Sequence, residues 1–300
     1  MTITTSNFAK ALFPGVNEWY GKSYNEHKVE YTDLFDSFTS RRAYEEDMSY
    51  SGMGLAQVKT EGGGISYDNS QQGWLTRYTH VTYALGFIIT REMMEDDLYD
   101  VVGERKARSL AFSLRQTKEI VAANVYNRAF NATYTGGDGL ELLSTLHLNV
   151  AGGTYANELA TAADLSEASL EQAVTDLMKF TDDRGLKIAV LPKTLIIPVD
   201  LWATADKIMK TEYEVDTANN TVNVVRGKFP GGVKLNHYLT DTDAWFIRTN
   251  VGSGMKYFSR RADEFDVDDD FDTDNAKYKA SYRCSFGWSD PKTLFGSPGA

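Results

Sequence analysis

Two neighbouring stretches near the C-terminus alternate strictly between two kinds of residue, and this pattern restricts the fold more than any other feature. In residues 265–274 every second position is aspartate, and in residues 277–288 every second position is apolar or aromatic. Period two is typical of strands, and the polar Asp274-Asn275 pair indicates a turn. We therefore predict an antiparallel hairpin whose outer face sets acids opposite bases. Its inner face would carry Tyr278, Ala280, Tyr282, Cys284, Phe286 and Trp288.

Residues 90–130 predict one long helix. Thr90 suits the N-cap, and acidic residues follow it, where the helix dipole favours negative charge. About 40 residues would give a rod of roughly 60 Å. Arg105, Arg108 and Arg115 fall together on one flank, beside an apolar stripe with spacings of three and four. The stripe consists of Ala107, Leu110, Leu114, Thr117, Val121 and Val125.

Glycine is frequent in residues 45–89, before this helix, and it includes the run Gly62-Gly63-Gly64. After Gly73, β-branched and aromatic residues occupy both faces of a strand pattern. We predict a long two-stranded excursion, with residues 48–60 leading out and residues 65–89 returning. An isolated hairpin is marginal in water, so this arm is expected to need a partner surface.

The remaining segments indicate an α+β chain. Residues 1–44 show no sustained period and favour an extended, aromatic-bearing arm. A helix is expected from Asp164 or Ser166 to Gly185, and a second helix opens at Pro198. Short strands are expected around them, at residues 187–191, 194–197, 221–225, 233–239 and 244–248, which makes a mixed α/β module.

The overall charge argues against a general nucleic-acid-binding protein. The 300 residues include 31 basic and 42 acidic side chains, a net charge of −11. Phosphate binding needs clustered lysine and arginine, so for the basic flank of the long helix we favour pairing with acidic neighbours. No apolar run approaches the roughly 18 residues of a membrane span, and the N-terminus lacks the pattern of a signal peptide.

No group of residues has the spacing of a catalytic or metal site. The four histidines, His27, His80, His147 and His237, share no ligand spacing, so structural or surface roles are favoured. Cys284 is the only cysteine, and its aromatic neighbours favour a buried, inert thiol. Phosphate-binding glycine motifs and a nucleophile elbow do not occur. We predict no catalytic, cofactor-binding or metal-binding residues, no cofactor and no enzymatic activity.

The aspartates of residues 266–274 raise the question of a calcium site. An EF-hand loop beginning at Asp266 would need glycine at its sixth position and glutamate at its twelfth. Phe271 and Lys277 occupy those positions, which excludes an EF-hand. Charge pairing with the next strand is favoured, and a looser ion site among the aspartates is the alternative.

The order of these segments resembles the major capsid proteins of tailed bacteriophages, which have the Hong Kong 97 type capsid fold. The likeness covers most of residues 40–295. It begins with GFIITREMMEDDLY at residues 86–99, LSTLH at 143–147 and ADLSEASL at 163–170. It continues with LIIP at 195–198, AWF at 244–246, FSRR at 258–261 and RCSFGWSD at 283–290.

The resemblance implies a division of the chain into five parts. Residues 1–44 would be the N-terminal arm, and residues 45–89 the extended loop that reaches over a neighbouring subunit. Residues 90–163 would form the peripheral domain with its spine helix, and residues 164–254 the axial domain at the capsomer centre. Residues 255–300 would return to the peripheral domain as a hairpin.

The resemblance also implies a function and its partners. The expected function is a structural head protein that self-assembles, as hexameric and pentameric capsomers, into an icosahedral shell enclosing double-stranded DNA. The location would be the virion, after assembly in the host cytoplasm. A separate scaffolding protein is expected because the arm begins almost at Met1, with a portal and decoration proteins as further partners and packaged DNA contacted non-specifically. Some relatives cross-link lysine to asparagine; Lys59 lies in the loop, and no such chemistry is assigned to it.

Two other classes of protein are weighed against this interpretation. An encapsulin-type compartment has the same fold but encloses enzymes, and the contents of the shell would separate the two. A secreted glycan-binding or hydrolytic protein is disfavoured because the signal peptide and a catalytic carboxylate or triad motif are missing.

Overall fold

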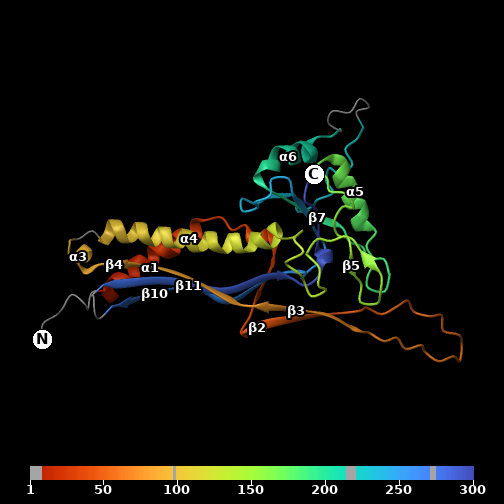
Figure 1. The fold of residues 1–300 in the computed structure, drawn as a ribbon, viewed down its shortest axis with the longest axis horizontal. Helices are drawn as coiled ribbons and strands as arrows, with labels where there is room; N and C mark the ends of the chain where they lie inside the picture. Colours follow the sequence, from red (N-terminus) through yellow and green to blue (C-terminus); the bar gives the residue numbers. More distant parts are fainter. Residues whose placement is uncertain (1–8, 97–98, 214–220, 271–274) are drawn as a thin grey trace.

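The computed structural model describes residues 9–96, 99–213, 221–270 and 275–300. Figure 1 shows an elongated part, in which helices lie along a long sheet, and a more compact part at one end. A thin arm projects from that end. The described chain mixes helices and antiparallel and parallel strands, so the α+β prediction is confirmed.

The predicted C-terminal hairpin is confirmed and forms the centre of the long sheet. β10 (Met255–Asp269) pairs antiparallel with β11 (Ala276–Trp288), which sets Asp266 opposite Lys279. Tyr278 and Tyr282 are each 1% exposed, so the inner face was assigned correctly there, whereas Phe286 and Trp288 at its end are only half-buried. β10 starts ten residues earlier than predicted. The aspartates at 272 and 274 lie outside the described residues.

Two further strands complete this sheet, in the order β1-β10-β11-β4. β1 (Asp36–Thr39) runs parallel to β10, and β4 (Val81–Ile89) runs antiparallel to β11. The helix α4 (Tyr99–Asn127) lies along one face (Figure 1). The main core therefore lies between the inner face of the hairpin and α4.

The long helix was predicted over residues 90–130, but it is divided. Thr90 caps a short helix, α3 (Arg91–Glu95), by accepting a hydrogen bond from the Met93 N–H, and α4 begins only at Tyr99. The acids that suggested a helix start repeat four residues apart, as at Glu92 and Asp96, and like charges at that spacing disfavour a continuous helix. The 29 residues of α4 span about 43 Å rather than 60 Å.

The buried surface of α4 is wider than the predicted stripe. Leu110 and Leu114 are buried as expected, but Val121 and Val125 are only half-buried. Arg115, predicted on an exposed basic flank, is 7% exposed, and its guanidinium lies 4.3 Å from the centroid of the Tyr24 ring. A second layer therefore covers this side of α4, which periodicity within α4 could not reveal.

That layer is the N-terminal segment, which was predicted to be extended. Residues of α1 (Ala9–Glu26) form a helix that packs against α4, followed by α2 (Tyr31–Leu34). Tyr20 stacks on Phe265 of β10 with ring centroids 4.9 Å apart. Tertiary packing of this kind stabilises a helix whose own sequence shows little periodicity.

The glycine-rich arm also has fewer residues in strands than predicted. β2 (Tyr44–Tyr50) pairs with β3 (Gln72–Thr79), and residues 51–71 between them form no strand. The predicted returning strand breaks at His80, whose buried imidazole contacts the hydroxyls of Ser40 and Ser285. Beyond this point the chain becomes β4 and joins the main sheet instead of the arm.

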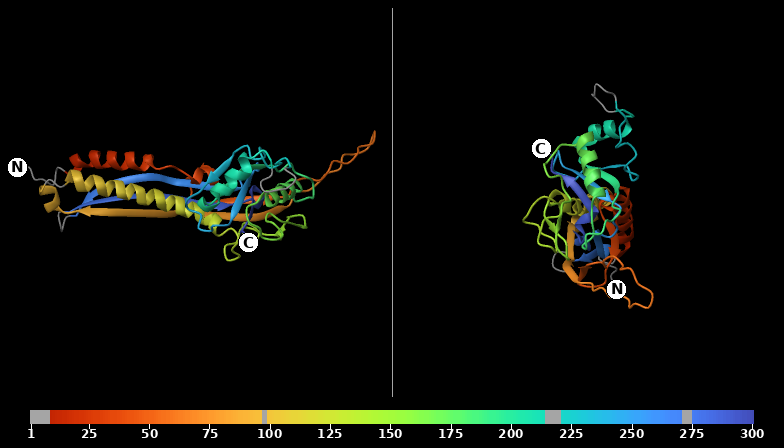
Figure 2. Two further views of the ribbon diagram at one scale, coloured as in Figure 1. Left: turned by 90° about the horizontal axis from the view of Figure 1, so that it is seen from above. Right: turned by 90° about the vertical axis from the view of Figure 1, so that its right-hand side faces the viewer.

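The compact part contains a second sheet and a second core (Figure 2). The sheet has the order β12-β9-β7-β8. The expected helix start is confirmed, since Ser166 caps α5 by accepting a hydrogen bond from the Ser169 N–H. The elements are α5 (Glu167–Met178), β7 (Pro192–Ile197), the 3-10 helix η2 (Val199–Leu201), α6 (Trp202–Lys210), β8 (Val233–Leu235), β9 (Trp245–Thr249), the 3-10 helix η3 (Pro291–Thr293) and β12 (Leu294–Ser297).

Several details differ from the expectation for this region. The helix α5 ends at Met178, seven residues before the predicted end at Gly185. Residues 187–191 and 221–225 were predicted as strands, yet each contributes only an isolated bridge, Thr181 to Lys187 and Tyr213 to Val222. β12 pairs with β9 rather than with the hairpin, so the end of the 255–300 segment joins the second sheet. Gly296 permits this pairing because a Cβ there would lie 2.9 Å from the Trp245 carbonyl oxygen.

Candidate assembly surface

The arm beyond β2 and β3 exposes a set of apolar side chains that the described chain does not cover. Figures 1 and 2 show it projecting away from the rest of the molecule. Val58 is 94% exposed and Tyr67 is 93% exposed. Clusters of exposed apolar side chains mark interaction sites. The exposed apolar residues of this segment are Tyr50, Met53, Leu55, Val58, Ile65 and Tyr67.

The backbone of the arm is also largely without partners. The ladder between β2 and β3 ends with the hydrogen bond from the Ser51 N–H to the Gln71 carbonyl, at 2.9 Å. Farther out, a turn from Thr60 to Gly63 closes the tip, where Gly62 has φ +75°, a conformation that favours glycine. Beyond the hydrogen bond from Ser51 to Gln71 the arm is therefore an extended loop and not a hydrogen-bonded hairpin.

One arginine holds both sides of the arm at its base. Arg184 Nε donates to the Gly52 carbonyl at 3.2 Å, and Nη2 donates to the Asp68 carboxylate at 3.2 Å and to the Asn69 carbonyl. Hydrogen bonds from the Gly54 and Asn69 N–H groups, followed by the charge of Arg184, lower the pKa of Asp68. Arg184 lies in the turn after α5, so this contact fixes the arm to the compact part. No motif in the sequence indicates this contact.

Buried charges fix the N-terminal segment to α4. The Glu119 carboxylate accepts hydrogen bonds from the N–H groups of Glu30 and Tyr31, at 3.2 and 2.8 Å. Burial raises the pKa of Glu119, although these hydrogen bonds oppose the shift. From the preceding residue, Lys118 Nζ donates to Tyr24 Oη at 2.7 Å and to Asp263 at 3.1 Å. These contacts hold the N-terminal segment in place along α4.

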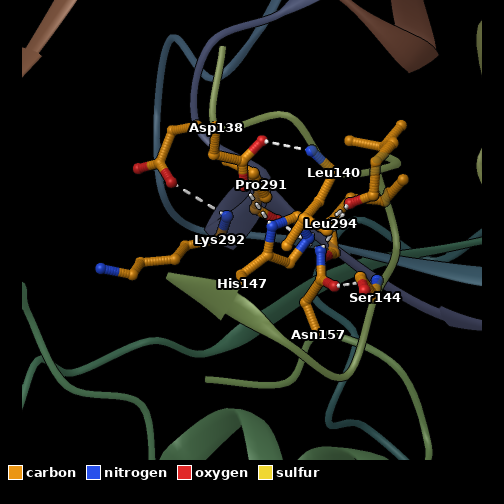
Figure 3. A network of polar contacts seen from close by, with 10 residues as sticks. Asp138, Leu140, Ser144, His147, Asn157, Pro291, Lys292 and Leu294 are labelled. Atoms are coloured by element: carbon orange, nitrogen blue, oxygen red, sulfur yellow. Dashed lines mark hydrogen bonds and ion pairs between the residues drawn. The ribbon is translucent and has the colours of Figure 1, made fainter. Parts of the chain in front are cut away.

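His147 and Asn157 connect the loop before α5 to the C-terminal segment (Figure 3). His147 Nδ1 lies 2.6 Å from the Asp138 carboxylate, and both side chains are buried. Asn157 Nδ2 donates to the carbonyls of Pro291 and Leu294, at 3.0 and 3.3 Å. These groups are paired within the protein, which is typical of structural polar networks.

The other residues considered in the sequence also lie in structural settings. His237 Nδ1 lies 2.6 Å from the Glu30 carboxylate, and the His27 ring lies 4.9 Å from the Phe112 ring. Cys284 is 2% exposed, and burial raises the pKa of its thiol to about 12. In the described ranges, no three His, Cys, Asp or Glu side chains are placed to hold a metal ion.

The basic flank of the long helix separates into different environments. Arg105 is exposed, Arg108 pairs with Glu104 at 2.5 Å, and Arg115 is buried against the Tyr24 ring. The flank is therefore not one continuous surface for phosphates. None of the described helices is long and apolar enough to cross a bilayer.

The long sheet with a helix along it, the compact second sheet and the projecting apolar arm agree with the layout expected from the resemblance to phage capsid proteins. Residues 75–296 match the phage capsid protein family. The chain belongs to that family, and it is a structural protein of the capsid. No curated protein matches the chain.

Solved capsid structures share the fold at low sequence identity. The capsid protein of a native GTA particle has a TM-score of 0.54 and 14% identity, covering 91% of this chain and 93% of its own. The protein of Mycobacterium phage Che8 has a TM-score of 0.52 and 12% identity, with 90% of each chain covered. The procapsid protein of bacteriophage JBD30 has a TM-score of 0.52 and 13% identity, covering 96% of this chain and 75% of its own.

Proposed function

We propose that this chain is the major capsid protein of a tailed phage and that many copies assemble, as hexameric and pentameric capsomers, into an icosahedral shell around double-stranded DNA. The observation that carries the proposal is the arm, because its exposed apolar side chains and unpaired backbone have no role in an isolated subunit. Membership of the phage capsid protein family supports a phage head as the kind of shell that the chain forms. Catalysis has no place in this function.

Three parts of the structure would have separate roles in a shell. The long sheet with α1 and α4 would be the peripheral domain, residues 164–254 with β12 the axial domain, and the arm an intersubunit clasp. Assembly would take place in the host cytoplasm with a separate scaffolding protein and a portal, and decoration proteins would bind the finished virion. DNA would contact the shell non-specifically.

The test compares the complete protein with a variant that lacks the arm. Residues 52–70 are replaced by Asn-Gly, because two residues of this kind close a hairpin between paired strands. We expect the variant to keep its circular dichroism spectrum and thermal transition, since β2 and β3 retain their pairing, and to form no shells by electron microscopy. Closed shells built by the variant would contradict the proposal.

The contents of the shell separate this function from an encapsulin-type compartment. Particles purified from infected cells should contain nuclease-protected double-stranded DNA. Particles that contain a defined cargo enzyme and no DNA would favour the compartment.

A further inference from the structure

β4 is an edge strand that lacks the usual protection against pairing with another chain. It is the last strand of its sheet, and within the described part of the chain it pairs with β11 alone. Six of its nine residues are exposed, and none is charged or proline. Long apolar edges are normally blunted by charges, proline or a covering segment, because they bind other strands.

The side chains of β4 that face α4 lie beside the buried side chains of β11, and an open groove adjoins them. Val81, Tyr83 and Leu85 lie opposite Cys284, Tyr282 and Ala280, which are buried. At the edge, however, Val81 is 49% exposed and Leu85 is 47% exposed. The adjoining groove has a volume of about 660 Å³ and a mixed lining. Its apolar and aromatic residues are Tyr83, Val121, Val125, Tyr134, Phe286 and Trp288, and its polar residues are Asn124, Arg128, Thr133 and Thr135.

The arm has the complementary properties. Residues 53–58 are extended, uncharged and free of backbone pairing beyond Gly54, and they expose Leu55 and Val58. The arm projects from the compact end, away from the sheet, so it cannot reach the β4 of its own chain (Figure 1). Only a second copy can bring the two segments together.

We propose that residues 53–58 of one copy add as a strand to the β4 edge of a second copy, with Leu55 packing beside Leu85. Main-chain hydrogen bonds would supply affinity, and the exposed Val81 and Leu85 of β4 would contact the apolar side chains of the added strand. Six residues at about 3.3 Å each span about 20 Å, which fits within the length of β4. The contact joins two different surfaces, so it is not a two-fold pair, and repeated copies form a ring if the rotation between neighbours closes. The inference rests on the proposed capsid function.

Disulfide trapping in assembled shells tests this contact. Leu55→Cys and Leu85→Cys are made in separate proteins, mixed and assembled, and the native Cys284 is buried and unreactive. In the control, Leu55→Cys is mixed with Phe112→Cys instead of Leu85→Cys. Phe112 is 46% exposed and lies on the opposite side of α4. Because docking raises the local concentration, the first pair should cross-link at least about tenfold faster than the control.

A charge at the edge provides a second readout. Leu85→Lys should leave the subunit folded by circular dichroism and prevent shells, whereas Leu85→Met should form shells as the wild type does. A disulfide between two Leu85→Cys copies, with none to Leu55→Cys, would mean that two β4 edges pair and would overturn the inference. Normal shells from Leu85→Lys, or cross-linking of the first pair at the control rate, would also overturn the inference. In each of these cases shells form, so the capsid function is not contradicted. A wild type that forms no shells even when it is produced together with its scaffolding protein would overturn both.

Discussion

Replacing Tyr282 with alanine measures how much the contact between the hairpin and α4 contributes to folding. The Tyr282 ring is buried, stacks on Tyr83 with centroids 5.3 Å apart, and lies 4.4 Å from Lys118 Nζ. Truncating a buried aromatic residue to alanine costs about 3–5 kcal/mol, from lost transfer energy and the cavity that remains. The ring stack and the cation–π contact would be lost as well, so we expect the upper part of that range.

Two control variants separate the ring from its hydroxyl and from charge pairing. The Tyr282 hydroxyl is buried, with no hydrogen-bond partner among the described residues. Tyr282→Phe should therefore be at least as stable as the wild type, because an unpaired buried polar group costs about 1–3 kcal/mol. Lys279→Ala removes an exposed side chain opposite Asp266 and should cost less than about 1 kcal/mol.

Urea unfolding of the unassembled protein, followed by circular dichroism, gives the free energies. All variants are measured at one protein concentration, because association adds its own stabilisation. Equal losses for Tyr282→Ala and Lys279→Ala would refute the assignment of faces. A loss in Tyr282→Phe as large as that in Tyr282→Ala would refute the attribution to ring packing.

Three further outcomes follow from the buried and clamped groups. Arg184→Ala should leave the free energy of unfolding within about 1 kcal/mol, because its arm contacts are exposed, but it should speed limited proteolysis of residues 52–70. The pKa of Glu119 is raised in the folded state, so its ionisation favours unfolding, and stability falls as pH rises through that pKa. Urea unfolding across pH should show a flatter curve for Glu119→Gln over that interval. Burial raises the pKa of the Cys284 thiol to about 12, so it should react with a disulfide reagent only after denaturation; rapid labelling of the native protein would contradict its burial.

The elements predicted well from sequence are those whose pattern is complete within a short segment. The alternation of residues 277–288 predicted β11 and its buried face, because side-chain direction in a strand follows from period two alone. Ser166 likewise predicted the start of α5, since an N-cap depends on neighbouring residues only. Local chemistry was sufficient for both.

The wrong predictions depend on contacts between distant segments. α1 has weak periodicity of its own, and Tyr20 and Tyr24 find partners on β10 and α4, far away in sequence. The division between β3 and β4 depends on His80 meeting Ser40 and Ser285. The family resemblance indicated the purpose of the arm, but not that Arg184 holds its base or that β4 is left as an open edge.

The distribution of charge explains why copies of so acidic a subunit can meet along these surfaces. A net charge of −11 on each chain opposes association, and this repulsion grows with the number of copies. β4 and residues 50–58 of the arm contain no charged residue, and the acids at the turn of β10 and β11 are balanced in part by Lys277, which pairs with Asp270 at 2.6 Å. Contact between uncharged segments avoids the desolvation of unpaired carboxylates, the costliest groups to bury. Physiological salt largely screens the repulsion between charges that are more than about 8 Å apart, so the burial of apolar surface can outweigh it.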